Sequence, residues 1–177
     1  VRVGIKGQEI REENVPPRNL VFLLDVSGSM MSADKLPLVK RGLALMTESL
    51  RPQDSIAIVV YAGNSGLVLP ATPGSQRGRI LKALDGLEAG GSTNGGDGIQ
   101  LAYSVAQQQF KKGGINRVIL ATDGDFNVGT TSEGALTRLI EDKRKSGVFL
   151  TVLGFGTGNT KDSTMEMLAD KGNGNYA

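Results

Sequence analysis

The chain is 177 residues long, and 39% hydrophobic against 21% charged residues is the composition of one globular domain with a sizeable core. Its 20 basic and 18 acidic residues are mixed along the chain and give a formal net charge of +2, which argues against a nucleic-acid-binding stripe. Histidine and cysteine are both absent, which excludes disulfides, thiolate metal sites and a Ser-His-Asp triad.

The two ends of the chain differ from its middle. Residues 1–5 alternate apolar with other residues, and Pro16-Pro17 separates them from the rest of the chain. We therefore expect residues 1–18 to be an N-terminal extension or a linker strand, and residues 19–177 to form one domain. Residues 172–177 stop where another strand could begin, so we expect a domain truncated before its last strand and helix, within a longer parent protein.

Oxygen-bearing side chains come directly after the first predicted strand. Residues 20–24 are apolar and β-prone, which predicts a strand buried on both faces. A tight turn allowed by a glycine can gather the alternate side chains of the next five residues around one point. These residues are Asp25-Val26-Ser27-Gly28-Ser29. Because carboxylate and hydroxyl oxygens are the ligands of hard cations, this stretch predicts a metal site.

The rest of the chain alternates helical with strand patterns. A helix is predicted to begin near Asp34 and Pro37, because apolar residues then recur at spacings of three and four. Further strands are predicted at residues 56–61, 118–121 and 149–155, an edge strand at 66–72, and further helices at 80–87, 99–110, 136–140 and 165–169. This pattern predicts an α/β fold: a doubly wound, Rossmann-like, mostly parallel central sheet with one antiparallel edge strand and helices on both faces.

Two more segments supply oxygen ligands at corresponding places. The glycine-rich residues 90–98 carry the hydroxyl of Thr93 and precede a helix that should begin near Asp97. A second carboxylate, Asp123, comes after the strand at 118–121. In doubly wound folds, ligands bind outside the carboxyl ends of the strands, where the strand order reverses. We therefore expect Asp25, Thr93 and Asp123 to converge at one edge of the sheet.

The order of these residues resembles the von Willebrand factor type A domain. The metal-ion-dependent adhesion site of that family is written Asp-x-Ser-x-Ser, then a distant Thr, then an Asp. All of its positions are filled here, by Asp25, Ser27, Ser29, Thr93 and Asp123. The resemblance covers the chain from about Asn19 onward and is greatest to bacterial envelope-associated members.

The resemblance implies a metal-dependent protein-binding function. Ser27, Ser29 and Thr93 look like direct ligands, whereas Asp25 and Asp123 would bind the cation directly or through water. Two carboxylates match a divalent charge, so we expect Mg²⁺, with Mn²⁺ or Ca²⁺ as alternatives. A partner protein would supply a Glu or Asp carboxylate to the open coordination position.

Several further properties are expected of such a domain. It is expected to be a monomeric, non-enzymatic adhesion module, exported or envelope-associated as part of a larger protein. It should bind no nucleic acid, and since no apolar run has membrane-spanning length, this chain should not insert into a membrane directly.

Other polar residues are candidates for the surroundings of the site. Asp97 fits either a place behind the ligands or a helix N-terminus, where its charge suits the helix dipole. Asp125 and Asn127 could line the rim or lie in a solvated turn. The full predicted surroundings are Gly28, Asn94, Asp97, Asp125 and Asn127.

Three residues outside the motif have simpler interpretations. Tyr61 and Asn64 come after the second strand and could line the rim of the site or lie in a solvated turn. Arg51 is expected on a solvated helix face, as is the basic run at 143–145.

Competing interpretations depend on single residues. Taken alone, Asp25 could be a capping or turn aspartate. A Mg²⁺-dependent phosphohydrolase also has an Asp after its first strand, but this chain has Ser27 where the acid/base Asp is expected, and no lysine beside the motif glycines. A structural subunit that docks onto a neighbouring domain of its own chain is a third class. An EF-hand is disfavoured because Val128 and Gly134 stand where a calcium loop beginning at Asp123 needs Gly and Glu.

Overall fold

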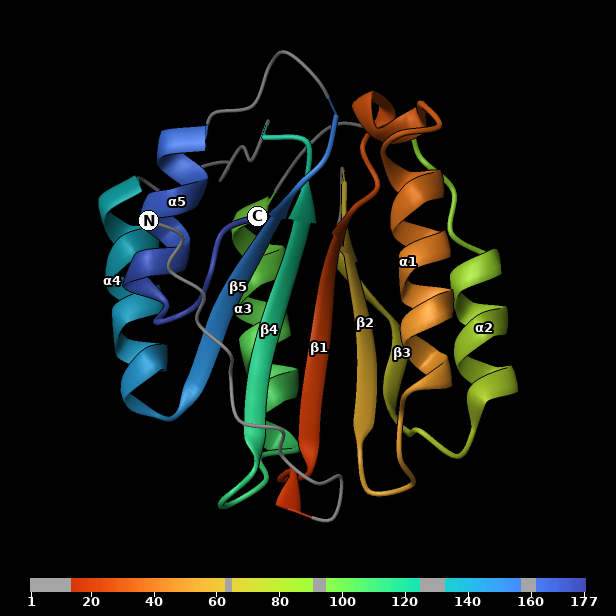
Figure 1. Cartoon of the computed structure of the whole chain (residues 1–177). Coiled ribbons are helices and arrows are strands. Elements are labelled where there is room, and N and C mark those ends of the chain that lie inside the picture. The colour runs from red at the N-terminus through yellow and green to blue at the C-terminus, as the bar shows by residue number, and fades with distance from the viewer. Residues whose placement is uncertain (1–13, 63–64, 91–94, 125–132, 157–161) are drawn as a thin grey trace, which may run out of the picture.

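The residues that the structure describes form a five-stranded sheet with helices on both faces (Figure 1). The structure is a computed structural model that describes residues 14–62, 65–90, 95–124, 133–156 and 162–177. The strand order is β3-β2-β1-β4-β5. The strands are β1 (Arg18–Asp25), β2 (Ser55–Tyr61), β3 (Ser65–Pro73), β4 (Ile115–Thr122) and β5 (Val148–Gly154). All neighbours are parallel except β2 and β3, so the predicted mostly parallel sheet with one antiparallel edge strand is confirmed.

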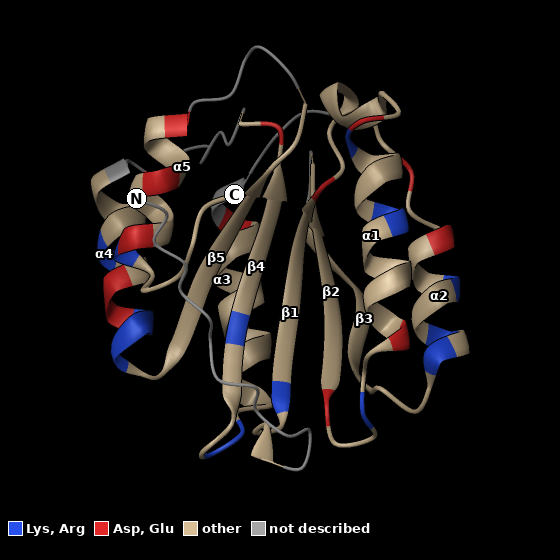
Figure 2. Ribbon diagram, viewed as in Figure 1, with Lys and Arg blue, Asp and Glu red and all other residues tan. Residues whose placement is uncertain are grey.

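The helices divide between the two faces of the sheet. They are the 3₁₀ helix η2 (Gly28–Met31), α1 (Leu36–Glu48), α2 (Arg77–Asp85), α3 (Gly95–Gln108), α4 (Glu133–Lys145) and α5 (Asp162–Lys171). In Figure 1, α1 and α2 lie at the right, α3 lies behind the sheet, and α4 and α5 lie at the left. Figure 2 shows that α1, α2 and α4 each carry both basic and acidic residues. The described part of the chain contains no helix long and apolar enough to span a membrane.

Strand β1 is the centre of the hydrophobic core. Every residue from Asn19 to Asp25 is buried. Alternate side chains enter opposite clusters: Leu20, Phe22 and Leu24 pack with α1 and α2, whereas Val21 and Leu23 pack with α3. Because both faces are covered, the unalternated apolar run in the sequence is explained by burial on both sides.

The carboxyl ends of β1 and β4 form the point where the strand order reverses. From β1 the chain passes to β2 and β3 on one side, and then to β4 and β5 on the other. Helix α3 lies close to the sheet beside this point. A Cβ at Gly98 would stand 2.9 Å from Tyr61 Cβ and 3.2 Å from Leu23 Cδ1, so only glycine permits this approach.

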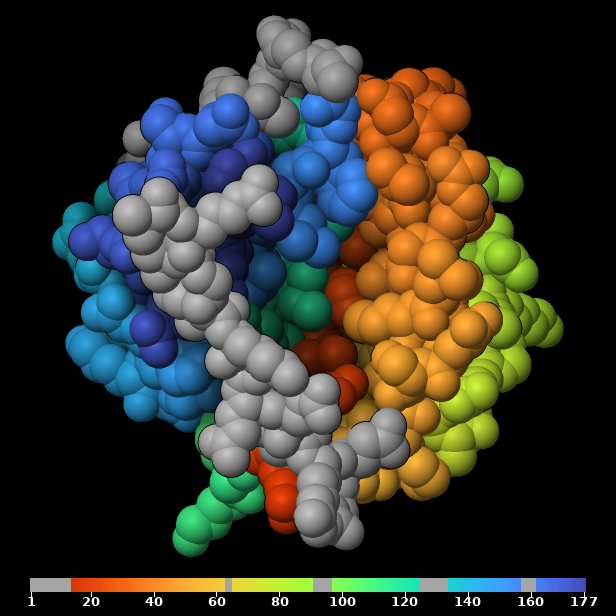
Figure 3. Space-filling model, viewed as in Figure 1, coloured from red at the N-terminus to blue at the C-terminus, as the bar shows by residue number. Residues whose placement is uncertain are grey.

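An apolar groove of about 380 Å³ lies on the other face, between α1 and the sheet (Figure 3). Leu38 and Leu43 of α1 form one wall, and Ile119 of β4 and Leu153 of β5 form the other.

A buried ion pair joins three segments at the opposite end of the sheet. Asp54 is 1% exposed and accepts hydrogen bonds from the backbone N–H of Arg18 at 2.9 Å and of Arg51 at 3.0 Å. The Arg51 guanidinium donates to the same carboxylate at 2.9 and 3.1 Å and to the carbonyls of Val15 and Pro16. The expectation of a solvated helix face for Arg51 is therefore wrong, because α1 ends at Glu48 and Arg51 lies in the turn that begins β2.

We predict that Asp54→Asn lowers the free energy of unfolding by about 2 kcal/mol at pH 7, because charge-assisted hydrogen bonds to a buried carboxylate are lost. Burial raises the pKa of Asp54, but the hydrogen bonds and charge of Arg51 outweigh it and hold the pKa below its usual value. This stabilisation is therefore present above the unfolded-state pKa and is lost as pH falls through the lower folded-state pKa.

Chemical denaturation between pH 7 and pH 2 measures both effects. The difference between wild type and variant should shrink at the acid end of the range. The matched control is Asp142→Asn, whose exposed carboxylate pairs with Lys145 three residues on, and which should change stability by less than about 0.5 kcal/mol. Equal effects of the two substitutions would contradict the assignment.

Candidate functional site

The loop after β1 is fixed by backbone hydrogen bonds to two other segments. Val26 N–H donates to the Tyr61 carbonyl at 3.0 Å, and the Val26 carbonyl accepts from Gly90 N–H at 2.7 Å. The chain then turns into η2, where Met30 N–H donates to the Ser27 carbonyl at 3.0 Å. These bonds bring the start of the glycine-rich stretch against the Asp-x-Ser-x-Ser motif.

Asp25 is fully buried beneath this loop. Its Oδ1 accepts the backbone N–H of Ser27 at 2.9 Å. Its Oδ2 accepts the hydroxyls of Tyr61 at 3.1 Å and Thr122 at 3.2 Å, which come from the neighbouring strands β2 and β4. The carboxylate is thus held by three donors, in an orientation set by the pairing of β1 with both neighbours.

Burial dominates the electrostatics of Asp25. Desolvation raises the pKa of this carboxyl above its usual value, and the negative charge of Asp123 adds to the rise. Hydrogen bonds from Ser27 and Tyr61 oppose the rise without cancelling it. A buried carboxylate whose charged form is disfavoured is a site at which a bound cation would be strongly stabilising.

Hydroxyls and a second carboxylate lie at the same edge. Ser27 Oγ and Ser29 Oγ are 3.0 Å apart, with Ser27 buried and Ser29 exposed. Asp123 comes directly after β4 and is 7% exposed. Its Oδ2 accepts a hydrogen bond from Lys35 Nζ at 2.9 Å, and the same ammonium donates to the Ser29 carbonyl at 3.0 Å. Within the described ranges no three acidic side chains cluster, so a cation here would depend on serine oxygens as well.

The structure brings together all four of the predicted ligands that it describes. Asp25, Ser27, Ser29 and Asp123 meet at the carboxyl ends of β1 and β4, and Gly28 begins η2. Asp97 lies in the first turn of α3 and is exposed. The remaining predicted positions, Thr93, Asn94, Asp125 and Asn127, lie outside the described residues, as does Asn64.

Sequence reasoning misplaced one residue that contacts the predicted ligands and missed two others. Tyr61 is neither on the rim nor in a solvated turn: it is 0% exposed and donates to Asp25 from below. Thr122 does the same from β4. Lys35 reaches Asp123 although no lysine adjoins the motif glycines. Lys35 could have been found from its position directly before α1, because the helix that follows β1 begins at the edge of the sheet where Asp25 and Asp123 lie.

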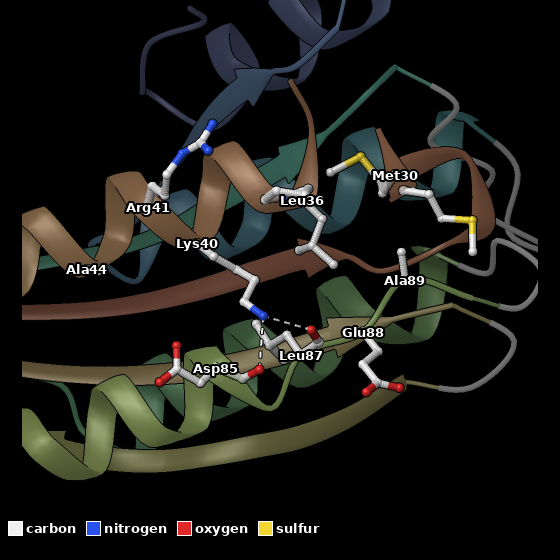
Figure 4. A pocket seen from close by; sticks show the side chains of 11 residues that line it. Met30, Leu36, Lys40, Arg41, Ala44, Asp85, Leu87, Glu88 and Ala89 are labelled. Atoms are coloured by element: carbon white, nitrogen blue, oxygen red, sulfur yellow. Dashed lines mark hydrogen bonds between the residues drawn. The ribbon is translucent and has the colours of Figure 1, made fainter. Parts of the chain in front are cut away.

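A groove of about 610 Å³ lies beside the motif loop (Figure 4). Met30 of η2 and Leu36 of α1 form its floor, and Leu87 and Ala89 form the facing wall. Lys40 crosses it and donates to the carbonyls of Asp85 at 2.9 Å and Leu87 at 3.0 Å.

Together these features define a doubly wound α/β domain with an oxygen-rich site at its switch point. The chain belongs to the von Willebrand factor type A domain family, whose model matches residues 20–126. It is 48% identical over its full length to the uncharacterised protein YfbK of Escherichia coli, of which it spans 31%. It is also 28% identical over 148 residues to human inter-alpha-trypsin inhibitor heavy chain H4, of which it spans 16%.

Solved structures share the same fold at lower identity. A von Willebrand factor type A protein from Catenulispora acidiphila superposes with a TM-score of 0.78 at 21% identity, over 92% of this chain and 38% of that one. An aerotolerance-related membrane protein from Bacteroides fragilis gives 0.69 at 21% identity, over 90% of both chains. Manganese-loaded TRAP protein from Plasmodium vivax gives 0.68 at 20% identity, over 88% of this chain and 63% of that one.

We predict that Asp25→Asn stabilises the metal-free protein at pH 7 by about 1 kcal/mol, because it removes a buried charge while keeping the shape of the side chain. The pKa of Asp25 is raised in the folded state. Its contribution to stability is therefore fully present below the unfolded-state pKa of about 3.9 and is lost as pH rises through the folded-state pKa.

Denaturation in the presence of a chelator, across pH 3 to 8, measures this effect. The advantage of the variant should grow with rising pH. Asp34→Asn is the matched control, because Asp34 is exposed in the next loop and its pKa is lowered by the Ser32 hydroxyl. A variant of Asp25 less stable than wild type at pH 7 would mean that its hydrogen bonds outweigh its burial.

Proposed function

We propose that this domain is a divalent-cation-dependent protein-binding module. The cation would be held by Asp25, Ser27, Ser29, Thr93 and Asp123, and would bind a Glu or Asp side chain of a partner protein. The observation that carries the proposal is the meeting of a buried carboxylate, two hydroxyls and a second carboxylate at the point where the strand order reverses.

The side chains present fit a hard divalent cation. They offer only oxygen, and the carboxylates of Asp25 and Asp123 match two positive charges. The Lys35 ammonium between Asp123 and Ser29 supports a position that attracts positive charge. When bound, Mg²⁺ would supply an open coordination position for an anionic oxygen. Mn²⁺ and Ca²⁺ are alternatives, and the manganese-loaded TRAP structure of the same fold supports testing Mn²⁺.

The chain's own residues would give the site its selectivity for a carboxylate. Tyr61 and Thr122 hold the Asp25 carboxylate in place from below, and Ser29 is exposed at the surface. Neutral hydroxyls in direct contact with the cation would leave it more electrophilic than directly bound carboxylates would, so an acidic side chain of a partner would gain a charge-assisted contact.

Family membership supports a protein-interaction role. We further propose that the domain is not an enzyme. Lys35 does approach the site, so the absence of a nearby lysine no longer argues against phosphoryl transfer. Ser27 still stands where the acid/base carboxylate would be needed, and the chain has no histidine. We further propose a monomeric domain in residues 19–177 of a longer, envelope-associated protein, in keeping with the Bacteroides fragilis membrane protein of the same fold. Docking onto a neighbouring domain of the same chain is a variant of this proposal.

Isothermal titration of the metal-stripped protein with Mg²⁺, Mn²⁺ and Ca²⁺ tests the metal site. We expect one site in the wild type and a loss of at least about 100-fold in affinity in Asp123→Ala and Asp25→Asn, because each removes a carboxylate from the site. Far-UV circular dichroism should show that both variants remain folded.

Asp142→Ala, in the exposed part of α4, is the control and should bind as the wild type does. A folded Asp123→Ala variant with unchanged Mg²⁺ affinity would overturn the proposed ligand set. Absence of binding in the folded wild type, at millimolar concentrations of all three cations, would overturn the proposed metal site in this chain.

A further inference from the structure

Lys35 occupies a special place in the site. It is the residue immediately before α1, and its side chain extends to the carboxyl end of β4. There its ammonium contacts Asp123 Oδ2 at 2.9 Å and the Ser29 carbonyl at 3.0 Å. One ammonium thus joins two residues of the predicted ligand set, which are separated by almost a hundred positions in the sequence.

The arm of Lys35 is packed into the fold. The side chain is 23% exposed, whereas that of Lys145, in a helical ion pair with Asp142, is 73% exposed. Gly156, just after β5, adopts a φ of +96°, and a Cβ at this position would stand 2.7 Å from Lys35 Cε. The end of β5 therefore leaves a passage for the aliphatic arm, and the positive φ of Gly156 favours glycine at this position.

We propose that Lys35 is a built-in counter-cation that competes with the divalent cation for Asp123 and thereby sets the metal affinity of the site. This inference rests on the function proposed above. In the metal-free protein the ammonium partly neutralises the two carboxylates, Asp25 and Asp123. A divalent cation that takes Asp123 as a ligand must then move the ammonium away from Asp123 Oδ2, because two positive charges at one carboxylate oxygen repel each other.

The charges of the site favour such an exchange. With Lys35 in place, two carboxylates and one ammonium leave one net negative charge. With a divalent cation and no ammonium, the same carboxylates are fully neutralised. With both cations present, the site would carry one net positive charge in a largely buried position, which is unfavourable. The lysine would therefore lower metal affinity and at the same time stabilise the metal-free domain.

Replacement of Lys35 by methionine tests the competition. Lys35→Met keeps an unbranched aliphatic arm for the passage over Gly156 and removes the charge. We expect Mg²⁺ to bind at least 10-fold more tightly to this variant than to the wild type in isothermal titration. We also expect the metal-free variant to melt at a lower temperature than the metal-free wild type, with a larger rise in melting temperature on adding Mg²⁺.

Two further variants separate charge from packing. Lys35→Arg keeps the positive charge and should leave Mg²⁺ affinity within about threefold of the wild type. Lys40→Met, in the adjoining helix α1, is the matched control, because Lys40 donates to two carbonyls in the groove of Figure 4 and contacts no predicted ligand among the described residues. It should leave Mg²⁺ affinity unchanged. If Lys35→Met fails to fold, Lys35→Gln makes the same comparison.

The outcomes distinguish this inference from the proposed function. Mg²⁺ binding by the wild type with equal or weaker binding by a folded Lys35→Met variant would overturn the role of Lys35 and leave the metal site intact. Binding only after Lys35 is replaced would support the competition by Lys35, and would overturn the proposed metal binding by the wild-type domain. No binding by either protein would overturn both the metal site and the counter-cation.

Discussion

The burial of the Asp25 carboxylate is the constraint on which the site depends. A central strand covered on both faces ends in a charged residue with no access to water. Such a charge is tolerated only when donors or cations compensate it. Ser27, Tyr61 and Thr122 supply three donors, each from a different segment of the chain. The pKa of the carboxyl nevertheless stays raised, so the compensation is incomplete.

This incomplete compensation connects stability with function. If hydrogen-bond donors fully compensated both carboxylates in the metal-free protein, a bound cation would add little further stabilisation. A cation site therefore leaves part of its negative charge uncompensated while it is empty. Lys35 supplies part of the missing positive charge at Asp123 from within the chain. The two ends of the sheet differ in this respect. At the opposite end, Arg51 and backbone donors hold the pKa of Asp54 below its usual value, as expected of an ion pair whose role is structural.

The backbone of the motif loop gives the site its geometry. Val26 is bonded to β2 through its N–H and to Gly90 through its carbonyl. The backbone that carries the motif side chains is therefore hydrogen-bonded to the central strands of the sheet, and the start of the glycine-rich stretch is held beside it. Gly98 lets α3 approach Tyr61 and Leu23 closely, and both of these side chains beneath the site are fully buried.

Local patterns in the sequence determined the elements, their order and the edge at which Asp25 and Asp123 meet, because burial on both faces and strand-end placement are properties of short segments. The tertiary structure alone decided the donors around them. Asp25 and Tyr61 are paired residues in the register of β1 and β2. If that register shifted by one residue, the tyrosine side chain would lie on the other face of the sheet. The partners of Lys35 and Arg51 could not be predicted, since long side chains near helix ends reach groups that no spacing rule specifies. Their carboxylate partners became apparent only once separate segments were packed together.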